Sequence, residues 1–189
     1  TLLSQVDASV GGKLGVDFQG LKNHLGVFNE PETVIIAPEF LQTLPQAELR
    51  SGYAEILKHG LIRDKAYFEK LKAENWETQD WESLIMHSVG IKKAVVQADP
   101  KEAGLRKILN FGHTIGHAFE SYFLDTDNHL LHGEAIALGM ICEGFLSFEK
   151  IGFSFEELNQ LTKMMLQIYG KVEFFEDHLD PILDLCLQD

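Results

Sequence analysis

The sequence predicts a mainly α-helical protein that begins with a short segment of loop and strand. Three observations lead to this prediction. Apolar residues recur at helical spacing through most of the chain after residue 41. The first 30 residues are rich in glycine and irregular in pattern. No G-x-G-x-x-G turn, the fingerprint of a dinucleotide-binding domain, lies between a strand and a helix. We therefore expect a loop and strand segment over residues 1–40 and a single helical domain over residues 41–189.

The elements are expected in the following order. The β-branched run TVIIAP at residues 33–38 ends at Pro38, which favours a short strand. A helix is expected to begin near Pro45, because proline suits the first turn of a helix. Further helices are expected over residues 64–74, 80–97, 104–123, 133–151 and 155–169, and a last one after Pro181.

Composition and charge narrow the class of protein. The chain has 189 residues, is 45% hydrophobic and carries a formal net charge of −13, which is ordinary for a globular protein except for its acidity. Residues 1–110 have a charge balance of −2, whereas residues 111–189 have −11. An acidic surface argues against nucleic acids and anionic membranes as partners. The longest apolar run, Ala135–Phe148, contains Glu143 and is too short to span a bilayer.

Targeting and redox signals are weak. Residues 1–12 lack the basic start and long apolar run of a secretory signal peptide. Cys142 and Cys186 lie in apolar segments, so we expect buried, reduced thiols rather than a disulfide or a zinc pair. These features favour a cytoplasmic location.

Four of the eight histidines lie between Leu109 and Gly139. They are His113, His117, His129 and His132. The first two are four residues apart, so on a helix they share one face. Their sequence is H-T-I-G-H, which lacks the glutamate of the H-E-x-x-H zinc protease motif. The residues alone are compatible with metal binding, acid–base chemistry or a helix interface.

A metal held by His113 and His132 would join two consecutive helices, and a third ligand must then come from elsewhere. Glu55 is the best-placed carboxylate, because it lies on an otherwise apolar helix. A half-exposed position, or an ion pair with Lys58 one turn further on, explains Glu55 equally well. Spacing alone does not rank His59, four residues after Glu55, below His113 as a ligand.

Basic residues of the first half are candidates for binding an anion. Lys13 and Lys22 lie among glycines, which let the backbone approach a ligand, although the stretch is not a P-loop. Arg106 and Asn110 precede His113 at helical spacing. If they lie on a single helix, the cation, the amide and the imidazoles of His113 and His117 form one stripe on its surface. Burial of such a polar stripe is unfavourable unless a polar molecule binds against it.

Five ordered motifs closely resemble the 3-dehydroquinate synthase family, from Thr1 to about Met140. They read TLLSQVDASVGGKLGV, KNHLGVF.EP, LP..ELRSGYAEILKHGLI.D, IKKAVVQADPKEAGLRKILNFGHTIGHAFE and LHGEAIALGM. Beyond about residue 150 the likeness is one of helical character alone.

The resemblance implies a lyase of the shikimate pathway, which serves aromatic amino-acid biosynthesis. Such an enzyme converts 3-deoxy-D-arabino-heptulosonate 7-phosphate to 3-dehydroquinate and releases phosphate. It uses NAD catalytically and a divalent metal, zinc or cobalt. The implied fold has an N-terminal nucleotide-binding domain and a C-terminal helical domain, with the active site between them, and the full-length protein is commonly a homodimer.

The resemblance also implies roles for individual residues. The metal ligands would be Glu55, His113 and His132. The catalytic residues would be Lys13, Lys58, Asn110 and His117. The substrate would be bound by Asn23, Lys92, Glu102 and Arg106, and the nicotinamide side of the cleft would include Asp7 and Lys22. His129 would be a loop residue.

Two departures from the family pattern limit what this chain is expected to do. The nucleotide-binding half does not appear in the sequence, and a lysine that the family carries near its C-terminal end has no counterpart before Asp189. The chain is therefore expected to be the C-terminal domain only and to be inactive alone.

Three alternative functions stay open. The first is another sugar phosphate cyclase, which forms an inosose or a valiolone. The pair Lys92 and Arg106 favours a substrate that carries a carboxylate instead. The second is a non-catalytic helical module that binds metal or a partner. The third is a protein like the iron-dependent alcohol dehydrogenases, whose metal ligands include more histidines and an aspartate.

Overall fold

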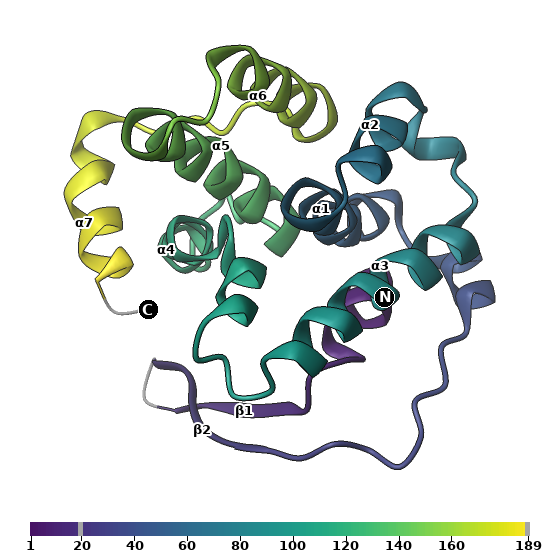
Figure 1. Ribbon diagram of the computed structural model, residues 1–189. Coiled ribbons are helices and arrows are strands. Elements are labelled where there is room, and N and C mark those ends of the chain that lie inside the picture. Colours follow the sequence, from purple (N-terminus) through teal and green to yellow (C-terminus); the bar gives the residue numbers. More distant parts are fainter. Residues whose placement is uncertain (19–20, 188–189) are drawn as a thin grey trace.

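The computed structural model describes residues 1–18 and 21–187, with side chains described outside residues 17–24. It is mainly α-helical, as the sequence predicts (Figure 1). The α-helices are α1 (Gln46–Arg63), α2 (Lys65–Ala73), α3 (Trp81–Ala98), α4 (His113–Phe123), α5 (His132–Ile151), α6 (Phe155–Tyr169) and α7 (Glu176–Cys186). Shorter turns are the π-helix η1 (Ser4–Ala8) and the 3₁₀ helices η2 (Pro38–Thr43), η3 (Trp76–Thr78) and η4 (Leu105–Asn110). The strands β1 (Lys13–Phe18) and β2 (Leu21–Phe28) form an antiparallel hairpin.

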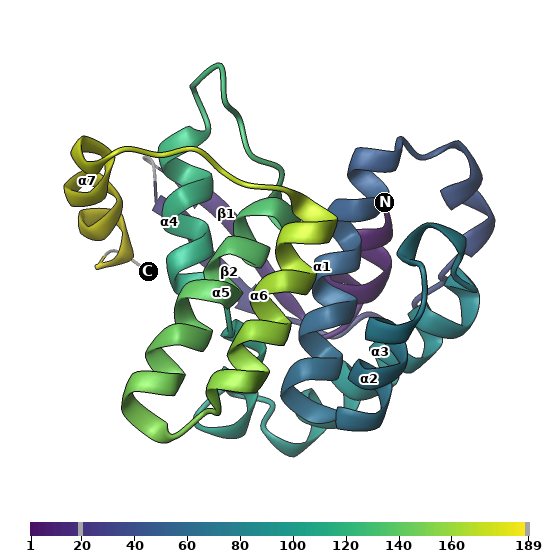
Figure 2. The same cartoon turned by 90° about the horizontal axis from the view of Figure 1, so that it is seen from above.

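Helices α1 and α5 form the centre of the fold and pack against each other. Helix α5 lies between α4 and α6, while α2 and α3 cover α1. Helix α7 packs on α4 at the opposite end of the molecule from α2 and α3 (Figures 1 and 2). The hairpin lies along one face, below α3 and α4 in Figure 1. The main core is built from side chains such as Tyr53, Ile56, Leu57, Ile136 and Met140, all of them fully buried.

Close packing of the central helices depends on glycines at their contacts. A Cβ atom at Gly133 of α5 would overlap the backbone of Ser51 in α1. One at Gly139 would overlap the carbonyl of Gly112, at the start of α4. The backbones of α1, α4 and α5 therefore approach one another more closely than larger side chains allow.

The glycine-rich start of the chain is more regular than its sequence pattern suggests. Residues 13–18 and 21–28 form the two strands of the hairpin, in which Leu14 pairs with Val27 and Val16 pairs with Leu25. The strand expected at residues 33–38 is wrong. Residues 33–37 belong to no helix or strand in the described part of the chain, and Pro38 begins η2. The β-branched side chains there have no neighbouring strand to pack beside, and Ile35 is 87% exposed.

The helix expected over residues 104–123 is divided in two. Phe111 leaves the helical conformation after η4, and Gly112 takes a positive φ of 80° directly before α4, so the two helices are separate. The expected single stripe from Arg106 to His117 therefore does not form on one helix. The last helix begins at Glu176, and Pro181 lies within it rather than before it.

The other expected helices are confirmed to within a residue or two, and the first begins directly after Pro45. Cys142 and Cys186 are reduced thiols, as expected, although both are half-buried rather than buried. Among the described residues, no helix is long and apolar enough to cross a membrane.

Candidate metal and substrate site

Helix α1 carries Glu55 into the interior of the protein. The helix passes through the centre of the fold, and every residue from 51 to 60 is buried. Glu55 is 0% exposed, so the half-exposed position that its sequence context allowed is wrong. A carboxylate in such a place must be compensated by nearby positive charge.

His113 and His132 are the first residues of α4 and α5. The start of α4 is fixed by Glu143 of α5, whose carboxylate accepts the backbone N–H of Gly112 at 2.7 Å. The start of α5 is fixed to α1, because the backbone N–H of Gly133 donates to the hydroxyl of Ser51 at 2.9 Å. Both imidazoles are therefore held by helix starts that are tied to neighbouring helices.

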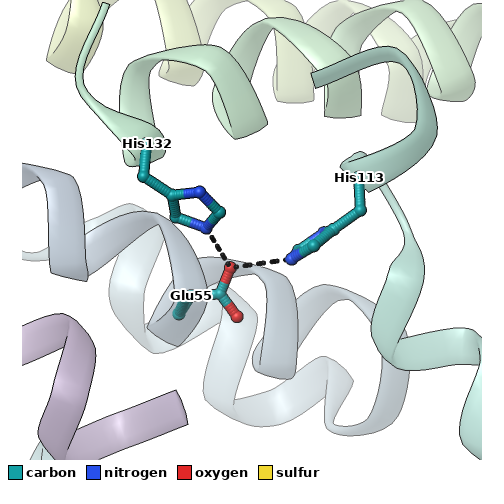
Figure 3. Close-up of side chains that lie close together, drawn as sticks. All are labelled: Glu55, His113 and His132. Atoms are coloured by element: carbon teal, nitrogen blue, oxygen red, sulfur yellow. Dashed lines mark ion pairs between the residues drawn. The ribbon is translucent and has the colours of Figure 1, made fainter. Parts of the chain in front are cut away.

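The two imidazoles meet the carboxylate at one oxygen atom. Nε2 of His113 lies 3.5 Å from Oε1 of Glu55, and Nε2 of His132 lies 3.7 Å from the same oxygen. Figure 3 shows the three side chains converging from three different helices. At these separations the contacts are longer than hydrogen bonds.

The donor set and its spacing fit a metal ion of the zinc type. The ligand atoms of Glu55, His113 and His132 all lie within 4.8 Å of one another. Ligands about 2.0–2.1 Å from a tetrahedral zinc ion lie about 3.4 Å apart, close to the observed separations. Two imidazoles and one carboxylate also leave a fourth position for water or substrate, which is the pattern of a catalytic site.

Positive charge already surrounds the carboxylate without a metal. Nζ of Lys58, itself 1% exposed, lies 2.5 Å from Oε2 of Glu55. Burial would raise the pKa of Glu55, but Lys58 and the nearby histidines hold it well below its usual value. Burial lowers the pKa of His113 to about 3, with Lys58 acting in the same direction. Burial would also lower the pKa of His132, but Glu120 and Glu55 outweigh it and raise this pKa to about 9.

A cavity of about 760 Å³ opens beside this cluster. Its walls come from η1, the hairpin, α1, α3, η4 and the starts of α4 and α5. The residues of the expected site that line it are Asp7, Lys13, Lys58, Lys92, Glu102, Arg106, Asn110, His113, His117 and His132. Among the described lining residues, four lysine or arginine side chains face two carboxylates, so the cavity favours an anionic molecule.

The cations and amides of the cavity wall are held by specific partners. Lys13 forms an ion pair with Glu102, which also accepts a hydrogen bond from Nδ2 of Asn110 at 2.9 Å. Burial would raise the pKa of Glu102, but these two partners lower it. Arg106 is 3% exposed and donates to the carbonyls of Pro100 and Gly11 at 3.0 and 2.9 Å. The wall is thus ordered before any ligand binds.

Not every candidate residue is placed at the cluster by the described part of the structure. Lys22 and Asn23 belong to β2, but their side chains lie outside the described part of the structure. His59 is fully buried and its Nδ1 lies 2.5 Å from Oγ of Ser88. A ring nitrogen of His59 lies within 4.8 Å of carboxylate oxygens of Asp7 and Glu55, and this set does not include the two histidines of the cluster. His129 is exposed in the loop between α4 and α5, as expected.

Sequence reasoning missed the residues that support the cluster. Glu120 lies near His132, Glu143 fixes the start of α4, and Ser51 fixes the start of α5. Glu120 had a sequence signal, because it follows His113 by two helical turns on the same face. Glu143 had one as well, as the single acid within the apolar run that became α5.

The fold and the site together define a class of protein. A helical domain that gathers two imidazoles and a buried carboxylate beside a cation-lined cavity is typical of a metal-dependent enzyme with a small anionic substrate. Comparison with known proteins narrows this class. Residues 52–189 match the family model described as 3-dehydroquinate synthase C-terminal, and residues 1–51 match the one described as 3-dehydroquinate synthase N-terminal. The chain belongs to the 3-dehydroquinate synthase family.

Two curated relatives illustrate the match, and both are named 3-dehydroquinate synthase. The protein of Parabacteroides distasonis is 42% identical over 192 aligned residues, which cover the whole chain and 54% of the relative. The protein of Streptococcus pyogenes is 48% identical over 166 residues, which cover 87% of the chain and 46% of the relative. The chain therefore spans about half the length of these curated relatives.

Solved structures share the fold at lower identity. A 2-epi-5-epi-valiolone synthase from Streptomyces hygroscopicus, solved with NAD⁺ and Zn²⁺ bound, has a TM-score of 0.84 and is 27% identical. The match covers 99% of this chain and 53% of that one. A 2-deoxy-scyllo-inosose synthase matches with a TM-score of 0.80 at 24% identity, over all of this chain and 52% of that one, which shows the fold alone.

Proposed function

We propose that this chain forms the metal- and substrate-binding part of an enzyme that converts 3-deoxy-D-arabino-heptulosonate 7-phosphate to 3-dehydroquinate and phosphate. The observation that carries the proposal is the meeting of Glu55, His113 and His132 at the edge of a cation-lined cavity. It occurs in a chain that is 42–48% identical to proteins named 3-dehydroquinate synthase.

The cluster Glu55, His113 and His132 would hold zinc or cobalt. When bound, the metal would polarise a substrate hydroxyl and NAD would accept and return a hydride. The relative solved with NAD⁺ and Zn²⁺ supports both cofactors. Lys58 keeps Glu55 ionised, so the carboxylate is ready to ligate a cation.

The cavity wall would bind and orient the substrate. The imidazole of His117 lies beside both metal-facing histidines, with ring centroids 5.1 Å from His113 and 5.9 Å from His132. Lys13 and Asn110 share Glu102 as a partner and would hold phosphate oxygens by charge and hydrogen bonds. Arg106 would contribute charge toward the substrate carboxylate, because its fixed guanidinium lines the cavity.

Phosphate release by the full-length protein tests this proposal. With NAD and zinc present, we expect release from 3-deoxy-D-arabino-heptulosonate 7-phosphate and none from glucose 6-phosphate, which lacks a carboxylate. The 189-residue chain alone is expected to bind about one zinc ion and to release no phosphate. If the full-length protein leaves the heptulosonate phosphate unchanged, the proposed reaction is wrong.

A second candidate is another sugar phosphate cyclase, which the valiolone synthase structure favours through its TM-score of 0.84. Release of phosphate from a sugar phosphate without a carboxylate, and not from the heptulosonate phosphate, would support this candidate. Arg106→Gln separates the two, because it is expected to raise KM strongly only for a substrate with a carboxylate.

A further inference from the structure

Both metal-facing imidazoles have an acceptor at their second ring nitrogen. Nδ1 of His113 lies 3.3 Å from the carbonyl oxygen of Phe111. Nδ1 of His132 lies 3.3 Å from Oε2 of Glu120, which is on α4, two turns after His113. The acceptor for His113 is backbone, whereas the acceptor for His132 is a side chain from another helix.

These acceptors determine which ring nitrogen faces Glu55. A neutral imidazole carries its proton on one nitrogen and a lone pair on the other. An acceptor at Nδ1 keeps the proton there and leaves the lone pair of Nε2 available to a metal. In His132, Nε2 is the nitrogen that faces Glu55, 3.7 Å from its Oε1.

The contact with Glu120 acts on the ring of His132 rather than on its backbone. His132 is the first residue of α5 and follows the buried Leu130, so its backbone is held on both sides. The side chain of Glu120 is 18% exposed and that of His132 is 19% exposed, so water competes only weakly for their contact.

We propose that Glu120 is a positioning residue that holds His132 with its proton on Nδ1 and its Nε2 directed at the metal. The proposal rests on the proposed metal site of Glu55, His113 and His132. Helix α4 then has two functions: it supplies one ligand, and it orients a second ligand on α5. No part of this role requires Glu120 to touch metal or substrate.

The same side chain has a competing explanation. Glu120, His117 and His132 also bring one ligand atom each within 4.8 Å of one another, so they are a possible donor set for a second cation. In that arrangement Nδ1 of His132 would carry no proton and Glu120 would be a ligand. The two explanations predict different numbers of bound ions.

Zinc affinity of the 189-residue chain, measured by competition with a chromophoric chelator, tests the proposal. The variants are Glu120→Ala, Glu120→Gln and the control Asp127→Asn, which removes one negative charge from the exposed loop before α5. We expect one ion per wild-type chain and an affinity about 10–100-fold weaker in Glu120→Ala. Glu120→Gln should lose less, because its amide oxygen still accepts from Nδ1. Asp127→Asn should change the affinity by less than about twofold.

Two further measurements separate positioning from folding. The melting temperature of each variant without metal shows whether it folds. If Glu120→Ala does not fold, the zinc affinity of Glu120→Gln tests the proposal in its place. In the cobalt-loaded chain, NMR should detect two shifted, exchangeable ring N–H protons, one from each ligating histidine. In Glu120→Ala one of these two signals should exchange much faster with solvent.

The outcomes are distinct. Unchanged zinc affinity in Glu120→Ala, with one ion bound to the wild type, overturns the role of Glu120 but leaves the metal site intact. No zinc bound by the wild type overturns both the metal site and this inference. Two ions per wild-type chain, with one lost in Glu120→Ala and in His117→Ala, overturns positioning in favour of a ligand role.

Discussion

Lys92 and Asp7 are bound to each other at the cavity wall. Nζ of Lys92 lies 2.6 Å from the backbone oxygen of Asp7 and 2.5 Å from its carboxylate Oδ1. The family resemblance places these residues on the substrate side and the nicotinamide side of the cleft. Their contact fastens η1 to α3 and joins the two sides of the site through one ion pair.

Replacing Lys92 by methionine should destabilise the chain. The variant keeps the apolar stem but removes two charge-assisted hydrogen bonds from a side chain that is 9% exposed. The free energy of unfolding in urea should fall by about 1–3 kcal/mol. Lys93→Met, at an exposed neighbouring position, is the control and should change it by less than about 0.5 kcal/mol. Equal effects of the two variants would contradict a structural role for the pair.

Glu55 and Lys58 should show strong coupling in a double-mutant cycle without metal. Glu55→Gln leaves the Lys58 ammonium buried without its carboxylate, which should reduce the free energy of unfolding by about 3–5 kcal/mol. Glu55→Gln combined with Lys58→Met removes that buried charge and should recover part of the loss. Chemical denaturation of all four chains gives the coupling energy. Additive losses would show that the two side chains do not compensate each other.

His59 should make the metal-free chain less stable in acid. Burial, against an opposing effect of Glu55, lowers the pKa of His59 from 6.5 to about 4. Between these values the unfolded chain binds a proton that the folded chain does not, so stability falls as pH decreases from 6.5 to about 4. The total effect is about 3 kcal/mol.

A matched pair of variants isolates this effect, because His113 has a lowered pKa as well and adds a loss in the same direction. Between pH 6.5 and about 4, the slope of the unfolding free energy against pH reports the difference in protons bound by the unfolded and folded chains. His59→Gln should reduce this difference by about one proton. His129→Gln, at an exposed position, should keep the wild-type slope. Identical slopes in all three chains would mean that His59 is not held neutral.

Zinc binding should release about one proton per ion near neutral pH. His132 has a pKa raised to about 9 by Glu120 and Glu55 against the effect of burial, so it is protonated before metal arrives. His113, with a pKa of about 3, has no such proton to lose. Calorimetric titrations in buffers of different ionisation enthalpy measure the release. Affinity should also rise as pH increases toward 9, and a pH-independent affinity would exclude this exchange.

Gly139→Ala should disrupt the contact between α4 and α5. The added Cβ would overlap the carbonyl of Gly112, which should reduce the free energy of unfolding by about 1–3 kcal/mol and weaken metal binding. Gly144→Ala on the same helix is the control. Its Cβ would meet only the side chains of Leu161 and Leu158, at 3.1 and 3.4 Å, and helix propensity favours alanine. Thermal melting should therefore separate the two variants clearly.

The sequence predicted the helices well because their apolar spacing and terminal residues are local signals. Helices α2, α3, α5 and α6 were expected within a residue or two. The hairpin was missed because glycines dilute its alternation, and its pairs join residues such as Leu14 and Val27. The strand at residues 33–38 was wrong because a β-branched run favours an extended backbone but does not provide a neighbouring strand.

The candidate site was beyond local reasoning for another reason. Glu55 and His113 are brought together because α1 packs against α5 and α5 packs against α4, and spacing within one helix carries no information about these contacts. Sequence spacing also left His59 equal to His113 as a ligand. The family resemblance supplied the choice of His113, which stays a prediction; in the structure Nε2 of His113 lies 3.5 Å from Oε1 of Glu55. The division of residues 104–123 at Gly112 was hidden because glycine is tolerated inside helical patterns and its φ is set by tertiary structure.

The single oxygen of Glu55 that faces both His113 and His132 has a consequence for how the centre is loaded. Without metal, the proton on His132 supplies positive charge beside the carboxylate of Glu55. A bound divalent ion would supply that charge instead. The ligands are thus prearranged, and filling the centre is an exchange of one small cation for another rather than a folding event. Mild acid or a chelator should accordingly empty the centre while leaving the helical scaffold assembled and ready to be refilled.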